Sequence, residues 1–491
     1  MGIRYPKFEV SMRHPLICLL LLAAALPAVL AQKPAPPPAT VQVLMLSDFH
    51  FDPFRAITDA RLQQLIKAPP EQWSATLGKP ISSAEQAEVA LAAKKEGHCD
   101  GTRTDTDYAL LMSSLTAEQS KLAAPLFITV SGDLITHNFK CKYYSLVTNP
   151  TAAGLSDFAA KTAALVALKL NAAFPKSPVY LALGNNDSGC DDYFETEANK
   201  KLDNPYFDQV AKVFAAVALD SDNAKSILAT LPMRGDYSVL LPKPFADTKL
   251  IVLQDLFESA IYKGPCAGAY PVDAVGAQIA WLKKQLGDTK VKHFWIMAHI
   301  PPGVDPYNTI HYNQGGCPAN ATLSTDDLAD TLRSSTSDIE LVLYGHTHMD
   351  EMRLIRDSSG NGKVAGRLNP SITAWTGNYP SFTVAEVNPA KALLVDFTVY
   401  RSSDKTGSSG NWDYKYTYSG AYGQPDYSAA SLDTLTNIFK NGGSKRVAAY
   451  QKYYQSSPAK SNWNAYLCAI VSDTPTKYDA CNSCPARTPF H

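Results

Sequence analysis

Seven side chains of the kinds that bind metal ions follow short apolar segments of the sequence. They are Asp48, His50, Asp133, Asn185, His299, His346 and His348. Each short motif alone is weak, because a lone Gly-Asp or His-Thr-His is usually an ordinary turn or a hydrogen-bonded histidine. A centre with two metal ions needs one carboxylate between the ions and further nitrogen and oxygen donors around them. Together, these side chains predict a two-metal hydrolytic site.

The segments before these residues are predicted strands. Five apolar runs end directly at the polar motifs: 41–46, 125–130, 178–183, 292–297 and 339–344. Helical periodicity is found between them, at 105–123, 156–174, 205–219, 274–286 and 324–334. Alternating strands and helices predict an α/β fold whose central strands are buried on both faces. Ligands in such folds gather at the carboxyl ends of the strands, where the polar motifs fall.

The C-terminal part of the chain differs from the rest. Segments 381–387 and 392–402 predict an antiparallel hairpin. Residues 412–491 are rich in Tyr and Ser, with a helical stretch near 431–455 and three cysteines. We therefore expect one main domain over 41–411 and a small disulfide-linked C-terminal cap over 412–491.

Residues 1–31 have the pattern of a secretory signal peptide. Basic residues, the last of them Arg13, precede an apolar run that ends in small residues before Gln32. The alternative is a membrane anchor, but the run is short for a spanning helix and contains Pro27. We expect cleavage near Gln32, a Pro-rich tether over 32–40 and a secreted or periplasmic protein with no stable membrane span after signal removal.

Composition excludes one class of partner. The chain has 491 residues, of which 45% are hydrophobic and 19% charged, with a formal net charge of −1. A protein that binds nucleic acid without sequence preference normally shows an excess of basic residues. We therefore expect no nucleic-acid-binding face, and the oligomeric state is left open.

The cysteines favour disulfide bonds. Outside the predicted signal peptide there are eight: Cys99, Cys141, Cys190, Cys266, Cys317, Cys468, Cys481 and Cys484. An even number in an exported protein favours full pairing, whereas a zinc knuckle at 481–484 lacks an evident second ligand pair nearby. Eight cysteines allow about 105 pairings, so the sequence does not determine the connectivity. Because short loops are the easiest to close, we expect Cys468 to pair with Cys481 or Cys484.

The motifs also carry a family resemblance. DFH, GD, GNND and GHTH resemble the calcineurin-like metallophosphoesterase superfamily over most of residues 41–400. SGDLITH, AHIPPG and YGHTHMDE are similar to its acid sphingomyelinase-like phosphodiesterase branch, which includes endopolyphosphatases. The resemblance implies a four-layer fold, in which helices flank two facing mixed β-sheets. By weak analogy, it also implies a Cys266–Cys317 disulfide.

The resemblance assigns the seven side chains to two divalent ions. One ion would be held by Asp48, His50, Asp133 and His348, and the other by Asp133, Asn185, His299 and His346, so that Asp133 bridges them. A hydroxide between the ions would attack phosphorus in line, without a covalent enzyme intermediate. The histidine-rich donors suit zinc best, and manganese or iron would also accept them.

Two further residues are candidates for the reaction itself. Most of the superfamily has a histidine where this chain has Asn186, and an asparagine can donate a hydrogen bond to a phosphate oxygen but cannot protonate a leaving group. The acid sphingomyelinase-like branch has a histidine at the spacing of His137, placed to act as the general acid. The alternative for His137 is a turn cap.

Other residues are weaker candidates. Asn378 and Tyr379 lie where this branch places a segment beside the active site, and are candidate substrate contacts. His311 and Tyr312 would either line the substrate entrance or lie in a solvated loop. Glycosylation of the sequon at Asn186 would block the site, and the sequon at Asn320 matters only in a glycosylating host.

We expect a secreted phosphohydrolase that cleaves a phosphodiester or phosphoanhydride. Polyphosphate, a nucleotide and a sphingomyelin-like lipid are all open as substrates. The absence of a saposin-like segment weakens the hypothesis of a lipid substrate. Two alternatives remain: a metal-stabilised binding protein without turnover, supported only by Asn186, and a structural protein of the cell envelope.

Overall fold

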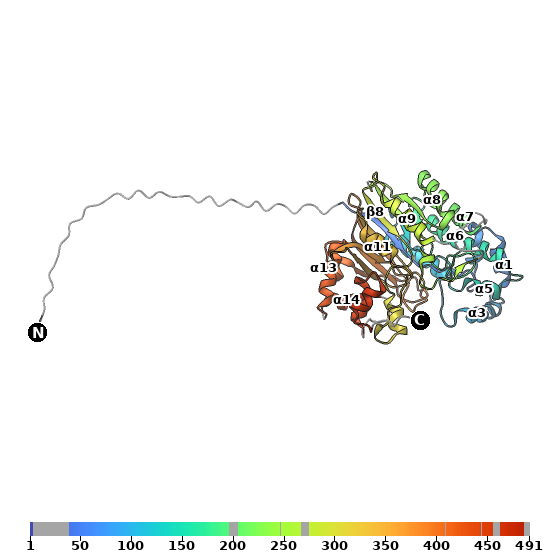
Figure 1. Cartoon of the computed structure of the whole chain (residues 1–491). Helices are drawn as coiled ribbons and strands as arrows, with labels where there is room; N and C mark the ends of the chain where they lie inside the picture. Colours follow the sequence, from blue (N-terminus) through green and yellow to red (C-terminus); the bar gives the residue numbers. More distant parts are fainter. Residues whose placement is uncertain are drawn as a thin grey trace, which may run out of the picture. The chain divides into compact units, whose positions relative to one another are not determined.

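A computed structural model describes residues 1–2, 39–195, 205–245, 247–266, 274–407, 409–442, 444–454 and 462–485. The predicted signal peptide and tether lie almost entirely outside these residues. Ala39–His491 forms one compact unit (Figure 1). Among the described residues, no helix has the length and apolar character needed to cross a membrane.

Two six-stranded mixed sheets form the centre of the fold. The first has the order β14-β13-β12-β1-β2-β3 and the second β10-β11-β9-β8-β6-β5. The strands of the first sheet are β1 (Val41–Leu46), β2 (Ile128–Val130), β3 (Val179–Leu181), β12 (Ser381–Asn388), β13 (Leu393–Ser402) and β14 (Trp412–Thr417). Those of the second are β5 (Tyr237–Leu240), β6 (Thr248–Val252), β8 (His293–Met297), β9 (Ile339–Tyr344), β10 (Glu351–Arg356) and β11 (Gly362–Leu368).

Parallel strands form one end of the first sheet and the middle of the second. β1 pairs with β2 and β2 with β3 in parallel, and β8 pairs in parallel with both β6 and β9. β12 and β13 form the predicted antiparallel hairpin. Because parallel strands end at the same sheet edge, the five polar motifs are brought to one side of the molecule.

Side-chain alternation in the second sheet explains how the layers pack. Trp295 and Met297 of β8 belong to the core that the two sheets share, whereas Phe294 and Ile296 face a second apolar cluster. That second cluster contains residues of α9 (Ala274–Leu286) and α11 (Asp327–Ser334). Successive side chains of a strand point to opposite faces, so these strands are buried on both sides. The predicted fold, with two facing mixed sheets and flanking helices, is confirmed.

The remaining helices cover the sheets or follow β14. In the first half of the chain they are α1 (Asp59–Lys67), α2 (Trp73–Leu77), α3 (Gln86–Asp100), α4 (Tyr108–Lys121), α5 (Phe139–Leu146), α6 (Ala152–Ala173), α7 (Pro205–Val217) and α8 (Ser221–Arg234). In the second half they are α10 (Pro306–Tyr312), α12 (Tyr418–Tyr422), α13 (Ala429–Lys440), α14 (Lys445–Tyr453), α15 (Trp463–Val471) and α16 (Pro475–Cys481).

The C-terminal segment begins inside the main fold. β14 pairs antiparallel with β13, so residues 412–417 extend the first sheet before the helices of the predicted cap begin. Tyr454 donates a hydrogen bond to the buried Glu351 of β10, at 3.1 Å. The boundary expected between 411 and 412 therefore separates two strands of one sheet.

Four disulfides connect the described cysteines. Cys468 bonds with Cys481, as the short loop predicts. The Cys266–Cys317 pair is wrong, because Cys266 bonds with Cys190 and Cys317 with Cys484. The small ladder between β4 (Phe194–Glu195) and β7 (Gly264–Pro265) brings Cys190 and Cys266 together, and the fourth bond joins Cys99 to Cys141.

Candidate metal centre

The seven predicted side chains meet where the parallel strands end. The loops that supply them follow β1 (Asp48, His50), β2 (Asp133), β3 (Asn185), β8 (His299) and β9 (His346, His348). Five of these residues have a left-handed backbone: φ is 50° at Asp48, 44° at His50, 55° at Asp133, 74° at His346 and 63° at His348. This conformation is uncommon outside glycine and tends to occur at functional sites. The loops thus hold their side chains in place at a conformational cost.

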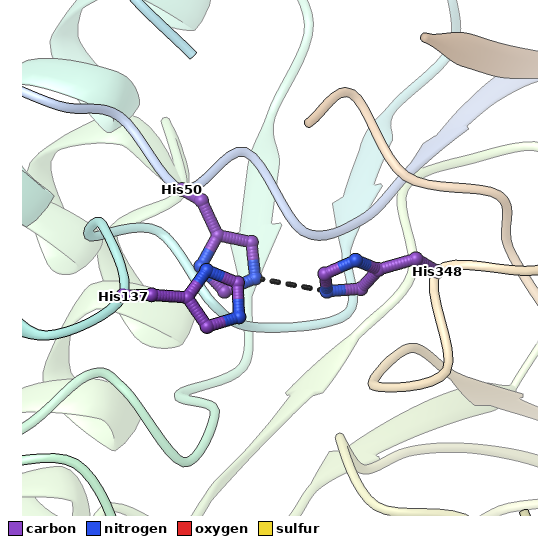
Figure 2. A group of neighbouring side chains, drawn as sticks. All are labelled: His50, His137 and His348. Carbon is purple, nitrogen blue, oxygen red and sulfur yellow. Dashed lines mark hydrogen bonds between the residues drawn. The ribbon is translucent and has the colours of Figure 1, made fainter. Parts of the chain in front are cut away.

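The first group of donors comprises Asp48, His50, Asp133 and His348, whose ligand atoms all lie within 4.8 Å of one another. His50 Nε2 lies 3.1 Å from His348 Nε2, the contact drawn in Figure 2. The same His50 nitrogen lies 3.2 Å from Asp133 Oδ2. All four residues are buried, so the group forms a polar cluster shielded from solvent.

The second group lies on the other side of Asp133. His299 Nε2 is 3.1 Å from Asp133 Oδ2 and 3.1 Å from Asn185 Oδ1. His346 Nδ1 is 2.9 Å from the same Asn185 oxygen. One oxygen of Asp133 therefore faces a histidine from each group, which is the place that the resemblance gives to a bridging carboxylate.

Hydrogen bonds orient the donors. Nδ1 of His50 lies 3.1 Å from the carbonyl of Ile135, and Nδ1 of His299 lies 2.7 Å from the carbonyl of Ser131. A proton on Nδ1 directs the lone pair to Nε2, as in most histidine metal ligands. Asn185 donates its amide N–H to Asp192, which turns its carbonyl oxygen toward the histidines.

The protonation of the histidines also fits a cation. Burial lowers the pKa of His346 to about 4 and that of His348 to about 3, so both rings are neutral, the form that binds metal. Burial also disfavours protonated His50 and His299, but the Asp133 carboxylate outweighs it and raises both pKa values, to about 10 for His299. The Asp133 carboxylate thus favours positive charge at His50 and at His299, on either side of it.

The donor set passes a direct test for metal binding. Asp48 Oδ2 is buried without a hydrogen-bond partner among the described residues, which is costly unless a cation lies nearby. Imidazole, carboxylate and amide oxygen together suit zinc, manganese or iron. The residues therefore fit divalent ions.

Close packing explains one glycine of the GNND motif. A Cβ at Gly184 would overlap the Asp133 carboxylate, so only glycine allows the two loops to approach so closely. The aspartate of this motif, Asp187, accepts hydrogen bonds from the backbone N–H groups of Leu134 and Gly184, both at 2.8 Å. Asp187 thus ties the loop after β3 to the loop after β2.

His137 lies beside the first group of donors. Its ring stacks on His50, with the centroids 3.9 Å apart and the planes 10° apart (Figure 2). Nδ1 lies 3.1 Å from each oxygen of Asp105, a buried residue that sequence reasoning missed. Burial alone would raise the pKa of Asp105, but the charge and hydrogen bond of His137 lower it well below its usual range. Asp105 therefore fixes the ring and leaves Nε2 available.

Asn186 has a different partner from the predicted one. Its side-chain N–H donates to Asp133 Oδ2 and its backbone N–H to Asp133 Oδ1, both at 2.9 Å. The residue is 3% exposed, which leaves no room for a glycan on the folded protein. These two contacts hold the Asp133 carboxylate in place.

The segment after β11 reaches the site through another residue than predicted. Asn378 is fully buried, and its amide donates to Ser371 Oγ and to the carbonyl of Thr373, so it holds its own loop. Tyr379 lies under Arg401, with Cζ 4.7 Å from the ring centroid. Trp375 is the residue that faces the site, since its ring stacks on His137 at 4.1 Å. A lone Trp in a polar loop gave no pattern by which to find it.

The remaining predictions concern the region of α10. His311 and Tyr312 end this helix, and Tyr312 is 65% exposed. His311 lies parallel to Tyr307, with centroids 6.1 Å apart. Asn320 is half-buried, and its backbone N–H donates to Thr309.

Comparison with known proteins agrees with this geometry. Residues 41–350 match the model of the family described as calcineurin-like phosphoesterase. The cyclic GMP-AMP phosphodiesterase SMPDL3A of Mus musculus is 24% identical over 90% of this chain and 92% of its own length. The acid sphingomyelinase-like phosphodiesterase 3b of Homo sapiens is 24% identical over 71% of this chain and 72% of its own length. The sphingomyelinase phosphodiesterase C of Dictyostelium discoideum is 22% identical over 64% and 67%.

Proposed function

The chain belongs to the calcineurin-like phosphoesterase family and is a metal-dependent phosphoester hydrolase, and we propose that it cleaves its substrate at a centre of two divalent ions. One observation carries this proposal: Asp133 Oδ2 lies between His50 Nε2, at 3.2 Å, and His299 Nε2, at 3.1 Å. A carboxylate in this place supports a shared ligand.

Each ion has its own set of residues in this proposal. Asp48, His50, Asp133 and His348 would hold one ion, and Asp133, Asn185, His299 and His346 the other. When bound, two such ions lower the pKa of a water molecule and polarise the phosphoryl oxygens. Zinc is the first candidate because four of the seven donors are imidazoles, and manganese and iron are the next.

His137 is the proposed general acid. As the oxygen of a water molecule bonds to phosphorus and loses a proton to solvent, the bond from phosphorus to the leaving oxygen breaks. The leaving oxygen then takes the proton of His137 Nε2. Support comes from Asp105, whose oxygens hold Nδ1 from 3.1 Å and so present Nε2 to the site. A general acid oriented in this way typically contributes about 10²–10⁴ in rate.

Phosphodiesters are the proposed first class of substrate. Relatives are named as phosphodiesterases for cyclic GMP-AMP and sphingomyelin, and phosphoanhydrides are the second class that we propose. We also propose that the protein is exported and loses residues 1–31, because the four disulfides suit an oxidising compartment. N-terminal sequencing of exported protein should begin near Gln32.

A leaving-group comparison tests the function and the general acid together. Wild-type protein loaded with zinc or manganese should hydrolyse diesters with 4-nitrophenolate and with alkoxide leaving groups. His137→Ala should slow the alkoxide substrate by roughly 10²–10⁴ and the nitrophenolate substrate far less, because nitrophenolate leaves without a proton. Equal losses would show that His137 is not the acid, and no hydrolysis by wild-type protein with either metal would refute the proposed function.

A further inference from the structure

Four flat groups form a stack that leads from the metal centre to the surface. His137 lies on His50, with ring centroids 3.9 Å apart, and Trp375 lies on His137 at 4.1 Å and an interplanar angle of 8°. The guanidinium of Arg103 follows on Trp375, with Cζ 5.5 Å from the ring centroid. Arg103 is exposed, so the stack ends at the protein surface.

Among the residues that the structure describes, no carboxylate forms an ion pair with Arg103, whose guanidinium lies over the Trp375 ring. The nearest acid in sequence, Asp105, is buried and is used by Thr136 and His137. The positive charge of Arg103 also opposes the rise in the pKa of Tyr307 that burial causes.

The position of Arg103 relates it to the leaving group of the substrate, and this step rests on the proposed function. His137 Nε2 gives its proton to the leaving oxygen, so the rest of the leaving group begins beside the His137 ring. Trp375 covers that ring, and Tyr307 is tied to the same loop by its hydroxyl, which donates to the carbonyl of Thr376 at 3.4 Å. A leaving group of several atoms that follows these rings outward ends at the guanidinium.

We propose that Arg103 selects substrates whose leaving group carries an oxyanion, either a carboxylate or a second phosphate. A guanidinium binds both groups through paired N–H donors. A quaternary ammonium is the opposite case: it binds well to an open aromatic face, but the outer face of Trp375 already holds the protein's own cation. Arg103 would repel a second positive charge there.

Three methyl aryl phosphate diesters test this selection. Their aryl leaving groups carry a nitro, a carboxylate or a trimethylammonium group in the para position, and methoxide is too poor a leaving group to compete. The ratio of wild-type to variant kcat/KM, taken for each substrate separately, cancels the intrinsic reactivity of the leaving group. Arg103→Ala should lower kcat/KM for the carboxylate by roughly 10- to 100-fold, the effect of losing a charge-assisted hydrogen-bond pair.

The other substrates and variants sharpen the expected pattern. In Arg103→Ala, kcat/KM for the uncharged nitro substrate should fall by no more than about threefold. For the trimethylammonium substrate kcat/KM should rise, because the variant removes the charge repulsion. Arg103→Glu should reverse the preference between the carboxylate and the trimethylammonium. Arg103→Lys should restore part of the carboxylate rate, since lysine keeps the charge but not the paired donors.

Arg401→Ala is the matched control. It removes the same charge from above another ring, Tyr379, and should leave all three rates as in the wild type. Equal loss on all three substrates in Arg103→Ala would overturn the proposal, because it would mean that Arg103 only holds Trp375 in place. If wild-type protein hydrolysed none of the three, the proposed function would fail and this inference with it.

Discussion

Two buried acidic clusters lie side by side in the fold, and the loop after β1 contributes to both. Asp48 belongs to the cluster with His50, Asp133 and His348, and Asp52 belongs to a cluster with Glu96 and Asp100. In each cluster the ligand atoms lie within 4.8 Å of one another, a spacing that would suit a metal ion. The clusters differ in what neutralises them.

The second cluster contains a cation of the chain itself. Lys142 Nζ lies 2.6 Å from Asp52 Oδ2, 2.6 Å from Asp100 Oδ2 and 3.6 Å from Glu96 Oε1. Around Asp48 and Asp133, by contrast, the described residues provide imidazoles and no lysine or arginine partner. An ammonium fills the second cluster, whereas the first can take an ion from solution. Acidic clustering alone therefore does not identify a metal site. A cluster that already contains a lysine or arginine of the chain does not need a metal ion, whereas one without such a partner can bind an ion.

The strongest test of this contrast removes the shared carboxylate. Asp133→Ala should lose both ions and lower the hydrolysis rate by roughly 10³-fold or more, because the Asp133 carboxylate faces a histidine of each group of donors. Elemental analysis of the purified variant measures the ions, and Asp133→Asn controls for side-chain volume. Wild-type metal content in both variants would contradict the assignment.

The matching test removes the internal cation. Lys142→Met leaves Asp52 and Asp100 buried without their ammonium partner and should lower the free energy of unfolding by about 3–5 kcal/mol, while the metal content stays as in the wild type. Lys140→Met is the control on the same helix, because Lys140 is 49% exposed and pairs with Asp191 at 3.3 Å. Its cost should be about 0–1 kcal/mol. Denaturant unfolding compares the two, and equal costs would refute the structural role of Lys142.

The sequence predicted the first cluster but not the second, for a physical reason. The metal-site donors directly follow apolar strands, and strand ends are visible as a change from apolar to polar residues. Helix α3 instead buries Glu96 and Asp100, so its docking face is acidic and has no apolar periodicity to detect. Lys142 is likewise an ordinary surface residue in the sequence.

The disulfides and the residues that contact His137 also show that sequence reasoning finds local pairs more easily than distant ones. Cys468 and Cys481 were predictable because 13 residues separate them. Cys317 and Cys484 are 167 residues apart, so only the tertiary fold brings them together. Asp105 and Trp375 contact His137 from distant loops, and neither has a local motif that marks it.

Asn186 gives a smaller effect on the first cluster. Its two hydrogen bonds hold Asp133, so Asn186→Ala should weaken metal binding by about 10- to 100-fold, the usual effect of losing a partner that orients a ligand. Asn185→Ala should weaken it more, because it removes a proposed ligand. Titration of metal-free protein with zinc compares the two, and unchanged affinity in Asn186→Ala would return this residue to the predicted role of phosphate donor.

The smallest effect at acid pH is expected on the free energy of unfolding, when Glu96 of the second cluster is replaced by glutamine. Burial and the nearby Asp52 carboxylate raise the pKa of Glu96 to about 8, so this acid is protonated at neutral pH and the ammonium of Lys142 has only Asp52 and Asp100 to pair with. A raised folded-state pKa means that the folded protein keeps a proton which the unfolded chain releases near pH 4.5. The stability that this group gives to the wild-type protein is therefore complete below about pH 4.5 and is lost as the pH rises to about 8.

Glu96→Gln imitates the protonated acid, so at pH 4.5 it should change the free energy of unfolding by less than about 1 kcal/mol. Above that pH the variant should gain on the wild type by at most about 1.4 kcal/mol per pH unit. Chemical unfolding at several pH values measures the difference, and a constant difference would mean that Glu96 is ionised in the folded protein, leaving three carboxylates around one ammonium.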